Sequence, residues 1–308
     1  MRRALNILYK LLPHALFLAL MGMMGVILQR GDRDWAALRP MLALAVLMEA
    51  IVLLRAKRWE TAGIFSILFG VLILWQAYAS FMNTSVSFLF PPPDKVVAVL
   101  VKDIRLILHS ILASFWLLLL GFALAVVLGV ALALLCGYNR RLQNLVVPIA
   151  DVFSAIPALV YAPYAVAVFP SFWLAALFVI ASGLFWPILI NTIQSINSID
   201  RTLLDSARAL DLNRRDMILR ILLPYCTPGL FNTFTMQISS AFMLLIGAEL
   251  MGMTSGVGWY VKYNSDFSNY TKVIAGFIVI GVLVSLVNAG LDLLKRRLLM
   301  WTNMEGRA

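Results

Sequence analysis

Charged residues are scarce in this sequence, and so are cysteine and histidine. Asp, Glu, Lys and Arg make up 13% of the 308 residues, whereas hydrophobic residues make up 62%. Soluble globular domains carry about 25% charged residues, so this composition is that of an integral membrane protein. The apolar runs are continuous, which excludes the alternating strands of a membrane barrel and predicts helices.

Motifs for catalysis and metal binding are also missing. The sequence has no G-x-x-x-x-G-K-[ST] for nucleotide phosphates, no H-E-x-x-H and no C-x-x-C. His14 and His109 are too few for a transition-metal centre. Cys136 and Cys226 are expected at cytoplasmic ends of spans, where a structural disulfide is not expected. We therefore expect no enzyme, no active site, no cofactor and no metal.

The hydrophobic runs are long enough for about eight membrane-spanning helices. A helix needs ~20 apolar residues to cross a bilayer. Polar interruptions leave segments of about that length at roughly 12–29, 38–54, 62–82, 106–136, 145–169, 172–195, 228–251 and 272–294. The expected fold is therefore an all-α integral membrane protein.

The basic residues predict the orientation of these spans, because Lys and Arg gather in cytoplasmic loops. Clusters stand before the first span (Arg2, Arg3, Lys10), after the second (Arg55, Lys57, Arg58), after the fourth (Arg140, Arg141), within 196–226 and after the eighth (Lys295, Arg296, Arg297). An even number of spans then places both termini in the cytoplasm. These loops account for the net charge of +10, so no nucleic-acid partner is expected.

One polar stretch interrupts the apolar pattern between the sixth and seventh predicted spans: DSARALDLNRRDMILRILLP. Leu203, Ala207 and Leu210 recur at helical spacing, which predicts a short amphipathic helix. Asn213 is a candidate cap for a second short helix, which Pro224 is expected to end. Two short helices joined by a turn form a platform for a soluble partner.

The same stretch resembles the signature of permease subunits of ATP-binding-cassette (ABC) importers. That signature reads Glu-Ala-Ala, three residues, Gly, nine residues, Ile, one residue, Leu-Pro. The matching positions are Asp205, Ser206, Ala207, Asp211, Ile221, Leu223 and Pro224. Asp211 stands where the signature has Gly, which takes positive φ freely. The resemblance implies that these residues belong to a loop that couples the permease to an ATPase.

Further matches resemble the sulfonate, nitrate and taurine branch of that family. They are Ser114, Gly121, Phe122, Gly129, Gly137, Arg140, Arg141, Pro148, Ile156, Pro157, Pro163, Asn191, Thr192 and the run from Gly247 to Leu250. Leu117 stands where family members commonly have Arg. The resemblance implies a type I importer permease core at 106–300 with its coupling loop at 196–226. An outer Pro-containing segment at 86–105 and an N-terminal extension of about three helices at 1–85 precede the core.

The function that the resemblance implies is that of the transmembrane permease subunit of an ABC importer in a bacterial inner membrane. The solute would be a small anion or organic molecule such as a sulfonate, taurine or nitrate. The implied partners are a dimer of ABC ATPase subunits, a second permease copy or a paralogue, a periplasmic or lipoprotein substrate-binding protein, and the lipid bilayer. The alternatives are a secondary transporter and a non-transporting scaffold with a degenerate coupling motif.

Four residues are candidates for the solute pathway or its gate. Ile156, Pro157 and Pro163 lie where prolines interrupt a predicted span, and such breaks occur in protein interiors or along cavities; simple kinked packing is the alternative. Glu249 is an acid within a span, which is costly and therefore a functional candidate; a structural pairing across a dimer is equally compatible. A second such acid, Glu49, is expected to reach toward the basic residues after its span.

Overall fold

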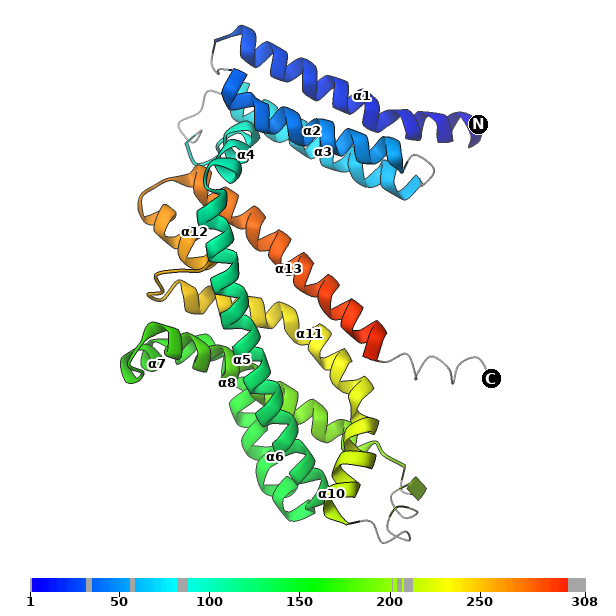
Figure 1. Cartoon of the computed structure of the whole chain (residues 1–308), viewed down its shortest axis with the longest axis vertical. Coiled ribbons are helices and arrows are strands. Elements are labelled where there is room, and N and C mark those ends of the chain that lie inside the picture. Colours follow the sequence, from blue (N-terminus) through cyan, green and yellow to red (C-terminus); the bar gives the residue numbers. More distant parts are fainter. Residues whose placement is uncertain are drawn as a thin grey trace. The chain divides into compact units, whose positions relative to one another are not determined.

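The computed structural model describes residues 2–31, 35–55, 59–81, 88–200, 202–203, 207 and 213–298, and every regular element within them is helical. Among these residues, seven long helices are apolar enough to cross a membrane. In chain order they are α1 (Arg2–Gln29), α2 (Trp35–Leu54), α3 (Trp59–Phe81), α5 (Ile104–Tyr138), α8 (Phe172–Asn197), α11 (Leu223–Glu249) and α13 (Tyr270–Leu298) (Figure 1). Two short helices, α4 (Pro93–Lys102) and α12 (Val257–Asp266), lie between long ones in the chain. The prediction of an all-α membrane protein with about eight spans is confirmed.

The fifth predicted span, at 145–169, is divided into shorter pieces. They are α6 (Arg140–Ala155), the 3₁₀ turn η1 (Ala158–Val160) and α7 (Ala162–Val168). Pro157 precedes η1 in extended backbone, and Pro163 lies in the first turn of α7. Proline has no N–H to donate, so it interrupts a helix interior but fits a first turn. The prolines therefore set the positions of the breaks.

The chain divides into two compact units. The first comprises residues 1–108 and 261–278. Within it, α1 packs against α2 and α3 around apolar side chains that include Leu20, Met41 and Phe69. The second comprises residues 109–260 and 279–308, of which those after 298 lie outside the described residues. The divisions predicted at 1–85, 86–105 and 106–300 stay predictions.

In the first unit, α4 is fixed by a buried polar contact with α3. The Gln76 amide donates to Asp94 Oδ1 at 2.8 Å, and the Asp94 backbone N–H donates to Gln76 Oε1 at 3.3 Å. Both side chains are buried, and buried polar groups are stabilised only when they find such partners. The reciprocal pair therefore holds the start of α4 against α3.

In the second unit, a line of small residues on α5 lets α8 approach closely. The residues recur at every fourth position and so share one helix face: Gly121, Ala125, Gly129, Ala133 and Gly137. Isoleucines of α8 lie opposite the glycines. A Cβ on Gly121 would lie 2.7 Å from Ile180 Cγ2, and one on Gly129 would lie 3.2 Å from Ile188 Cγ2. The shared face predicted for the two glycines is a helix contact.

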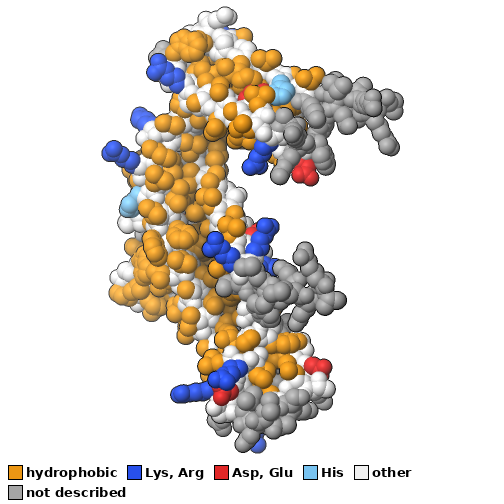
Figure 2. All heavy atoms as spheres, turned by 45° about the vertical axis from the view of Figure 1, so that its right-hand side comes forward, with side chains coloured by type: hydrophobic (Ala, Val, Ile, Leu, Met, Phe, Trp, Pro, Cys, Tyr) orange, Lys and Arg blue, Asp and Glu red, His pale blue; other side chains and the backbone are white. Residues whose placement is uncertain are grey.

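α8 is in turn the centre of the second unit. It packs against α11, α6 and α7, and it shares a buried apolar cluster with the end of α5 and the start of α11. Outside these contacts, large apolar side chains remain exposed along the helices of both units. Figure 2 shows such side chains over much of the visible face, with Lys and Arg in small separate groups. That distribution suits helices that are surrounded by lipid.

The second short helix predicted in the polar stretch begins where the sequence predicted, but it does not end at the predicted residue. Asn213 does cap a helix, because its Oδ1 accepts the Asp216 N–H at 2.8 Å. Pro224, however, does not end it. The short α10 (Arg214–Asp216) continues through a π-helical turn, η2 (Met217–Leu222), directly into α11, with Pro224 in the first turn of α11.

The π turn explains why Pro224 is tolerated. The Leu223 N–H donates to the Ile218 carbonyl, five residues back instead of four. Proline disrupts a helix because its ring clashes with the carbonyl four residues back and because it has no N–H. A wider turn immediately before Pro224 relieves that clash, so the chain stays helical.

The α5–α8 contact predicts a loss of stability for one glycine substitution and no such loss for another. Gly121→Ala places a methyl group against Ile180, and overpacking of this kind costs about 1–3 kcal/mol. We expect a lower thermal unfolding midpoint for the purified protein in detergent. Gly281→Ala in α13 is the control, because no atom lies within 4 Å of its added Cβ. Equal midpoints for the two variants would show that α5 and α8 do not pack this closely.

Candidate functional site

The predicted coupling loop at 196–226 is the first candidate site. Ala207 is helical and only 2% exposed, although polar residues surround it in the sequence. Ile221 and Leu223 are half-buried, and Pro224 is exposed. The remaining signature residues lie outside the described part of the chain: Asp205, Ser206 and Asp211. Burial of Ala207 identifies the side of this stretch that faces the protein.

The two ends of the loop are joined to each other. Ile199 near its start and Leu222 near its end share one buried cluster with the ends of α5 and α8. The Tyr225 hydroxyl donates to the Ser198 carbonyl at 3.2 Å. At the entry to the loop, the Thr202 N–H donates to Asp200 Oδ1 at 2.9 Å and lowers the pKa of that carboxyl. The loop is therefore anchored on the helices that precede and follow it.

Apolar side chains remain exposed on the same stretch. Leu203 is 42% exposed and Leu219 is 59% exposed. Leu203 lies outside the segments that are apolar enough to span a membrane, and Leu219 lies at the very start of one. Beside Leu219, Arg220 forms an ion pair with Asp216 at 2.8 Å, one helical turn apart. Apolar groups among charged groups form the kind of surface that a partner protein covers.

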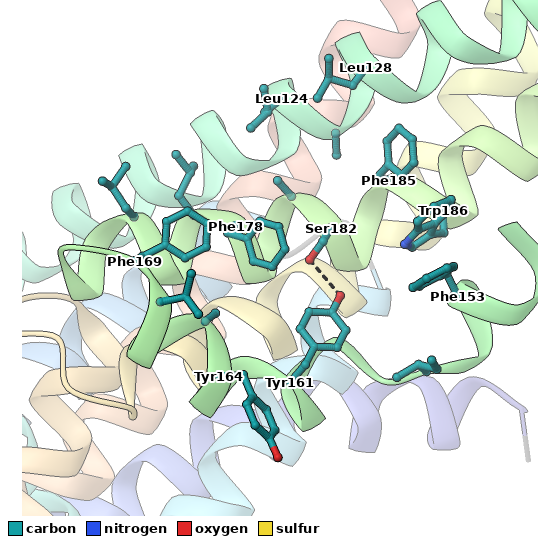
Figure 3. Close-up of a pocket in the computed structure, with 17 residues that line it drawn as sticks. Leu124, Leu128, Phe153, Tyr161, Tyr164, Phe169, Phe178, Ser182, Phe185 and Trp186 are labelled. Atoms are coloured by element: carbon teal, nitrogen blue, oxygen red, sulfur yellow. Dashed lines mark hydrogen bonds between the residues drawn. The ribbon is translucent and has the colours of Figure 1, made fainter. Parts of the chain in front are cut away.

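The second candidate site is a cavity of about 920 Å³ in the second unit (Figure 3). Its lining comes from α5, α6, α7 and α8 and includes Leu124, Leu128, Phe153, Phe178, Phe185 and Trp186. The Phe153 and Trp186 rings are stacked, with centroids 5.0 Å apart and planes inclined by 15°. The break between α6 and α7 forms part of its wall, because Ile156 and Tyr161 both line it.

The polar side-chain groups among the described lining residues are three hydroxyl groups and the indole N–H of Trp186. Tyr161 and Ser182 form a hydrogen bond of 2.8 Å across the cavity wall, as Figure 3 shows. Tyr164 is the third hydroxyl-bearing side chain. None of the described residues that line the cavity is charged. An apolar pocket with few polar groups suits an organic molecule that presents a ring or an aliphatic part.

The structure brings together some of the predicted pathway residues and separates others. Ile156 lines the cavity, whereas Pro157 and Pro163 shape the chain beside it without lining it. Glu249 is absent from the lining. The four residues therefore do not form one site.

Glu249 forms a buried cluster of its own. The carboxylate is 1% exposed and accepts two hydrogen bonds, from the Ser114 hydroxyl at 2.5 Å and from the Gly258 N–H at 2.6 Å. Ser114 Oγ accepts the Val257 N–H at 2.8 Å. The cluster joins α5, the end of α11 and the start of α12. These contacts lie within the chain, and the sequence pattern, which was compatible with a partner across a dimer, did not predict them.

Glycine is required beside this carboxylate. Gly256 has φ +118°, which residues with a side chain rarely adopt. A side chain there would also collide with the Glu249 carboxylate. The loop between α11 and α12 thus wraps tightly around one buried acid.

A second acid within a span is Glu49. It was expected to reach Arg55 or Lys57 after α2, of which Lys57 lies outside the described residues. Glu49 Oε1 contacts Nδ1 of His14 on α1, because α1 packs against α2 and brings the ring within reach. Pairing an acid with a nearby polar group inside the bundle is the usual arrangement for an ionisable residue in a membrane helix.

Removal of the Glu249 carboxylate tests how much the cluster stabilises the protein. Glu249→Ala leaves the Ser114 hydroxyl and the Gly258 N–H without their acceptor, and an unsatisfied buried group costs about 1–3 kcal/mol. We expect a lower unfolding midpoint and faster proteolysis between α11 and α12. Glu249→Gln keeps one acceptor oxygen and should lose less. Asp266→Ala, at an exposed residue of α12, is the control. A loss no larger than that control would contradict a stabilising role.

Comparison with known proteins supports one family. The model for "Binding-protein-dependent transport system inner membrane component" matches residues 125–300. The putative aliphatic sulfonates transport permease protein SsuC of Bacillus subtilis is 32% identical over 184 residues, covering 60% of this chain and 67% of that protein. The taurine transport system permease protein TauC of Escherichia coli is 26% identical over 239 residues, covering 75% and 86%. The nitrate import permease protein NrtB of Leptolyngbya laminosa is 31% identical over 182 residues, covering 58% and 64%.

Solved structures share the fold. A chain of the MetNI methionine ABC transporter in an inward-facing conformation aligns with a TM-score of 0.53 at 20% identity, covering 64% of this chain and 97% of that chain. A chain of a bacterial ABC transporter involved in import of the acidic polysaccharide alginate aligns with a TM-score of 0.52 at 18% identity, covering 84% and 96%. With the family model matching more than half of its length, this chain belongs to the binding-protein-dependent transport system inner membrane components: it is a permease component of an ABC importer and not itself an enzyme.

Proposed function

We propose that this permease admits an organic solute through the cavity of about 920 Å³ lined by Phe153, Phe178 and Trp186, the aromatic cavity. It couples the movement of that solute to a separate ATPase through the loop at 196–226. The observation that carries the coupling part is the unbroken helix from α10 through η2 into α11. The last part of the signature, Ile221, Leu223 and Pro224, lies within it. A displacement of the loop by an ATPase therefore acts directly on a span.

The contact with the ATPase is assigned to the exposed apolar side chains of the loop. Leu203 and Leu219 supply the apolar part, in the manner of a helix laid in a groove. Ala207 supports this surface from the buried side. Asp205, Ser206 and Asp211 complete the signature and are proposed to belong to the same loop.

The proposed assembly follows from the family. A dimer of ABC ATPase subunits lies on the cytoplasmic side, and a second permease copy or a paralogue completes the pathway. A periplasmic or lipoprotein substrate-binding protein delivers the solute. The family supports a bacterial inner-membrane location, and the distribution of Lys and Arg supports both termini in the cytoplasm. Residues 1–85 remain the proposed N-terminal extension, and 106–300 the proposed core.

The solute class is proposed from the chemistry of the cavity. The relatives named above are permease proteins for aliphatic sulfonates, for taurine and for nitrate. A lining of aromatic rings and hydroxyl groups, without a charged side chain among its described residues, suits the apolar part of an organic sulfonate better than a small inorganic anion. A secondary transporter would need ionisable groups along the pathway, and this lining does not favour one.

Ala207→Glu tests the coupling proposal. A buried charge at this position distorts the loop, so we expect the variant to reach the membrane but to lose the copurifying P-loop ATPase and its stimulated ATP hydrolysis. The measurement is affinity purification from gently solubilised native membranes, with mass spectrometry and an ATPase assay. Ala36→Glu is the matched control, because it makes the same change at an exposed residue of α2. If Ala207→Glu retained the full stimulated activity, the proposed loop contact would be wrong.

Ala181→Trp tests the cavity independently of the loop. Ala181 lines the cavity, so an indole there fills space that the solute is proposed to use. In cells that express the complete transporter, we expect uptake of labelled benzenesulfonate by the parent and at least a tenfold loss in the variant, with the ATPase still copurifying. Leu294→Trp, at an exposed apolar residue of α13, should transport normally. Uptake of nitrate without any uptake of sulfonate would overturn the proposed solute class.

A further inference from the structure

A second cavity, of about 370 Å³, lies within the first unit. It is formed by the first turn of α2, one face of α4 and the start of α13. Its polar lining consists of Asp94, Lys95, Lys102, Asn269, Thr271 and Lys272. Neither the coupling loop nor the aromatic cavity includes any of these residues.

The lining carries an excess of positive charge. Lys272 Nζ is paired with Asp103 at 2.6 Å, and Asp94 is buried against Gln76. These contacts engage both acids near the cavity. Lys95 and Lys102 are exposed and lie seven residues apart on α4, so they project from the same side of that helix. The cavity therefore presents two ammonium groups to a ligand.

The start of α13 adds hydrogen-bond donors. Asn269 Oδ1 accepts the Lys272 N–H at 3.4 Å, which leaves the Asn269 amide hydrogens directed elsewhere, and Thr271 supplies a hydroxyl. The first N–H groups of a long helix favour an anion. In α13 the Lys272 and Val273 N–H groups donate to the Asn269 carbonyl, which leaves those of Tyr270 and Thr271 for this role. Lysines, an amide and a hydroxyl around one cavity form a donor set for a phosphate-type oxyanion.

The cavity lies at the ends of apolar spans. α2 begins two residues before Ala37, α13 begins next to Thr271, and the apolar segment of α5 begins at Ile104, two residues after Lys102. Three spanning segments that start around one cavity place it at the level where hydrocarbon gives way to lipid headgroups.

Aromatic side chains mark the same level. Trp35, in the first turn of α2, is 62% exposed, and the Tyr270 ring at the start of α13 contacts Phe88 with centroids 5.4 Å apart. Trp and Tyr favour the membrane interface. Val101 and Ile104 are exposed and lie within two residues of Lys102 in the chain, so they offer an apolar surface for an acyl chain.

We propose that this cavity binds the phosphate of an anionic phospholipid headgroup, from the bilayer leaflet in which α2, α5 and α13 begin. Lys95 and Lys102 contact the phosphate oxygens, the start of α13 donates hydrogen bonds, and the acyl chains follow the exposed apolar side chains. A headgroup is favoured over a soluble anion because the cavity lies beside the ends of the spans, where phospholipid phosphates are concentrated. Basic pockets between membrane helices bind anionic headgroups by the same chemistry.

The test uses the full chain, purified in detergent and stripped of lipid. Short-chain phosphatidylglycerol, short-chain phosphatidylcholine and inorganic phosphate are titrated separately, with native mass spectrometry to count bound molecules and thermal unfolding to follow stabilisation. We expect phosphatidylglycerol to bind at one tight site per chain, at least tenfold more tightly than phosphatidylcholine. Equal binding of the two lipids would overturn the proposal. Inorganic phosphate that binds the same site as tightly as phosphatidylglycerol would overturn the lipid assignment in favour of a soluble anion.

Two sets of variants locate the site. Lys95→Gln combined with Lys102→Gln should abolish the tight phosphatidylglycerol site without lowering the unfolding midpoint measured in the absence of lipid. The charge-reversed pair, Lys95→Glu with Lys102→Glu, should bind still less. Lys262→Gln is the matched control, since Lys262 is an exposed lysine of the same unit outside the cavity. If Lys262→Gln weakened binding as much as the double variant, a diffuse attraction to basic residues would explain the result and the proposed site would be wrong.

Discussion

The close contact between α5 and α8 is the constraint on which the second unit depends. Lipid tails are as apolar as leucine, so helices in a bilayer associate through packing and not through the hydrophobic effect. The glycines of α5 let Ile180 and Ile188 of α8 pack against the α5 backbone. Because α8 also packs against α6, α7 and α11, its position fixes both the wall of the aromatic cavity and the entry to the coupling loop.

Much of this fold could be predicted from local sequence. The lengths of the apolar runs predicted the spans, because the bilayer imposes one length on any helix that crosses it. Pro157 and Pro163 indicated the interruption between α6 and α7, because proline acts on its own backbone and on that of its near neighbours. The shared face of Gly121 and Gly129 followed from helical periodicity, and α8 occupies that face.

The structural features that the sequence did not predict depend mostly on contacts between residues that are far apart in the chain. Ser114 and Glu249 are 135 positions apart, and no spacing rule connects them until α5 and α11 are placed in three dimensions. The His14–Glu49 contact is of the same kind. The continuation of the helix through Pro224 was missed for another reason: the turn before it closes hydrogen bonds over five residues, and residue pattern alone does not distinguish such a turn from an α-helical one.

The ends of that helix lie at two of the sites described above. From Arg214 to Glu249 the chain is helical without interruption, which corresponds to roughly 50 Å along the helix axis at the usual rise per residue, with a bend between α10 and the body of α11 (Figure 1). One end belongs to the loop assigned to the ATPase, and the other carries the carboxylate that holds the loop before α12. Under the proposed coupling, a displacement of the loop end is therefore passed along the backbone of one helix toward the Glu249 cluster, without a relay of side chains between them.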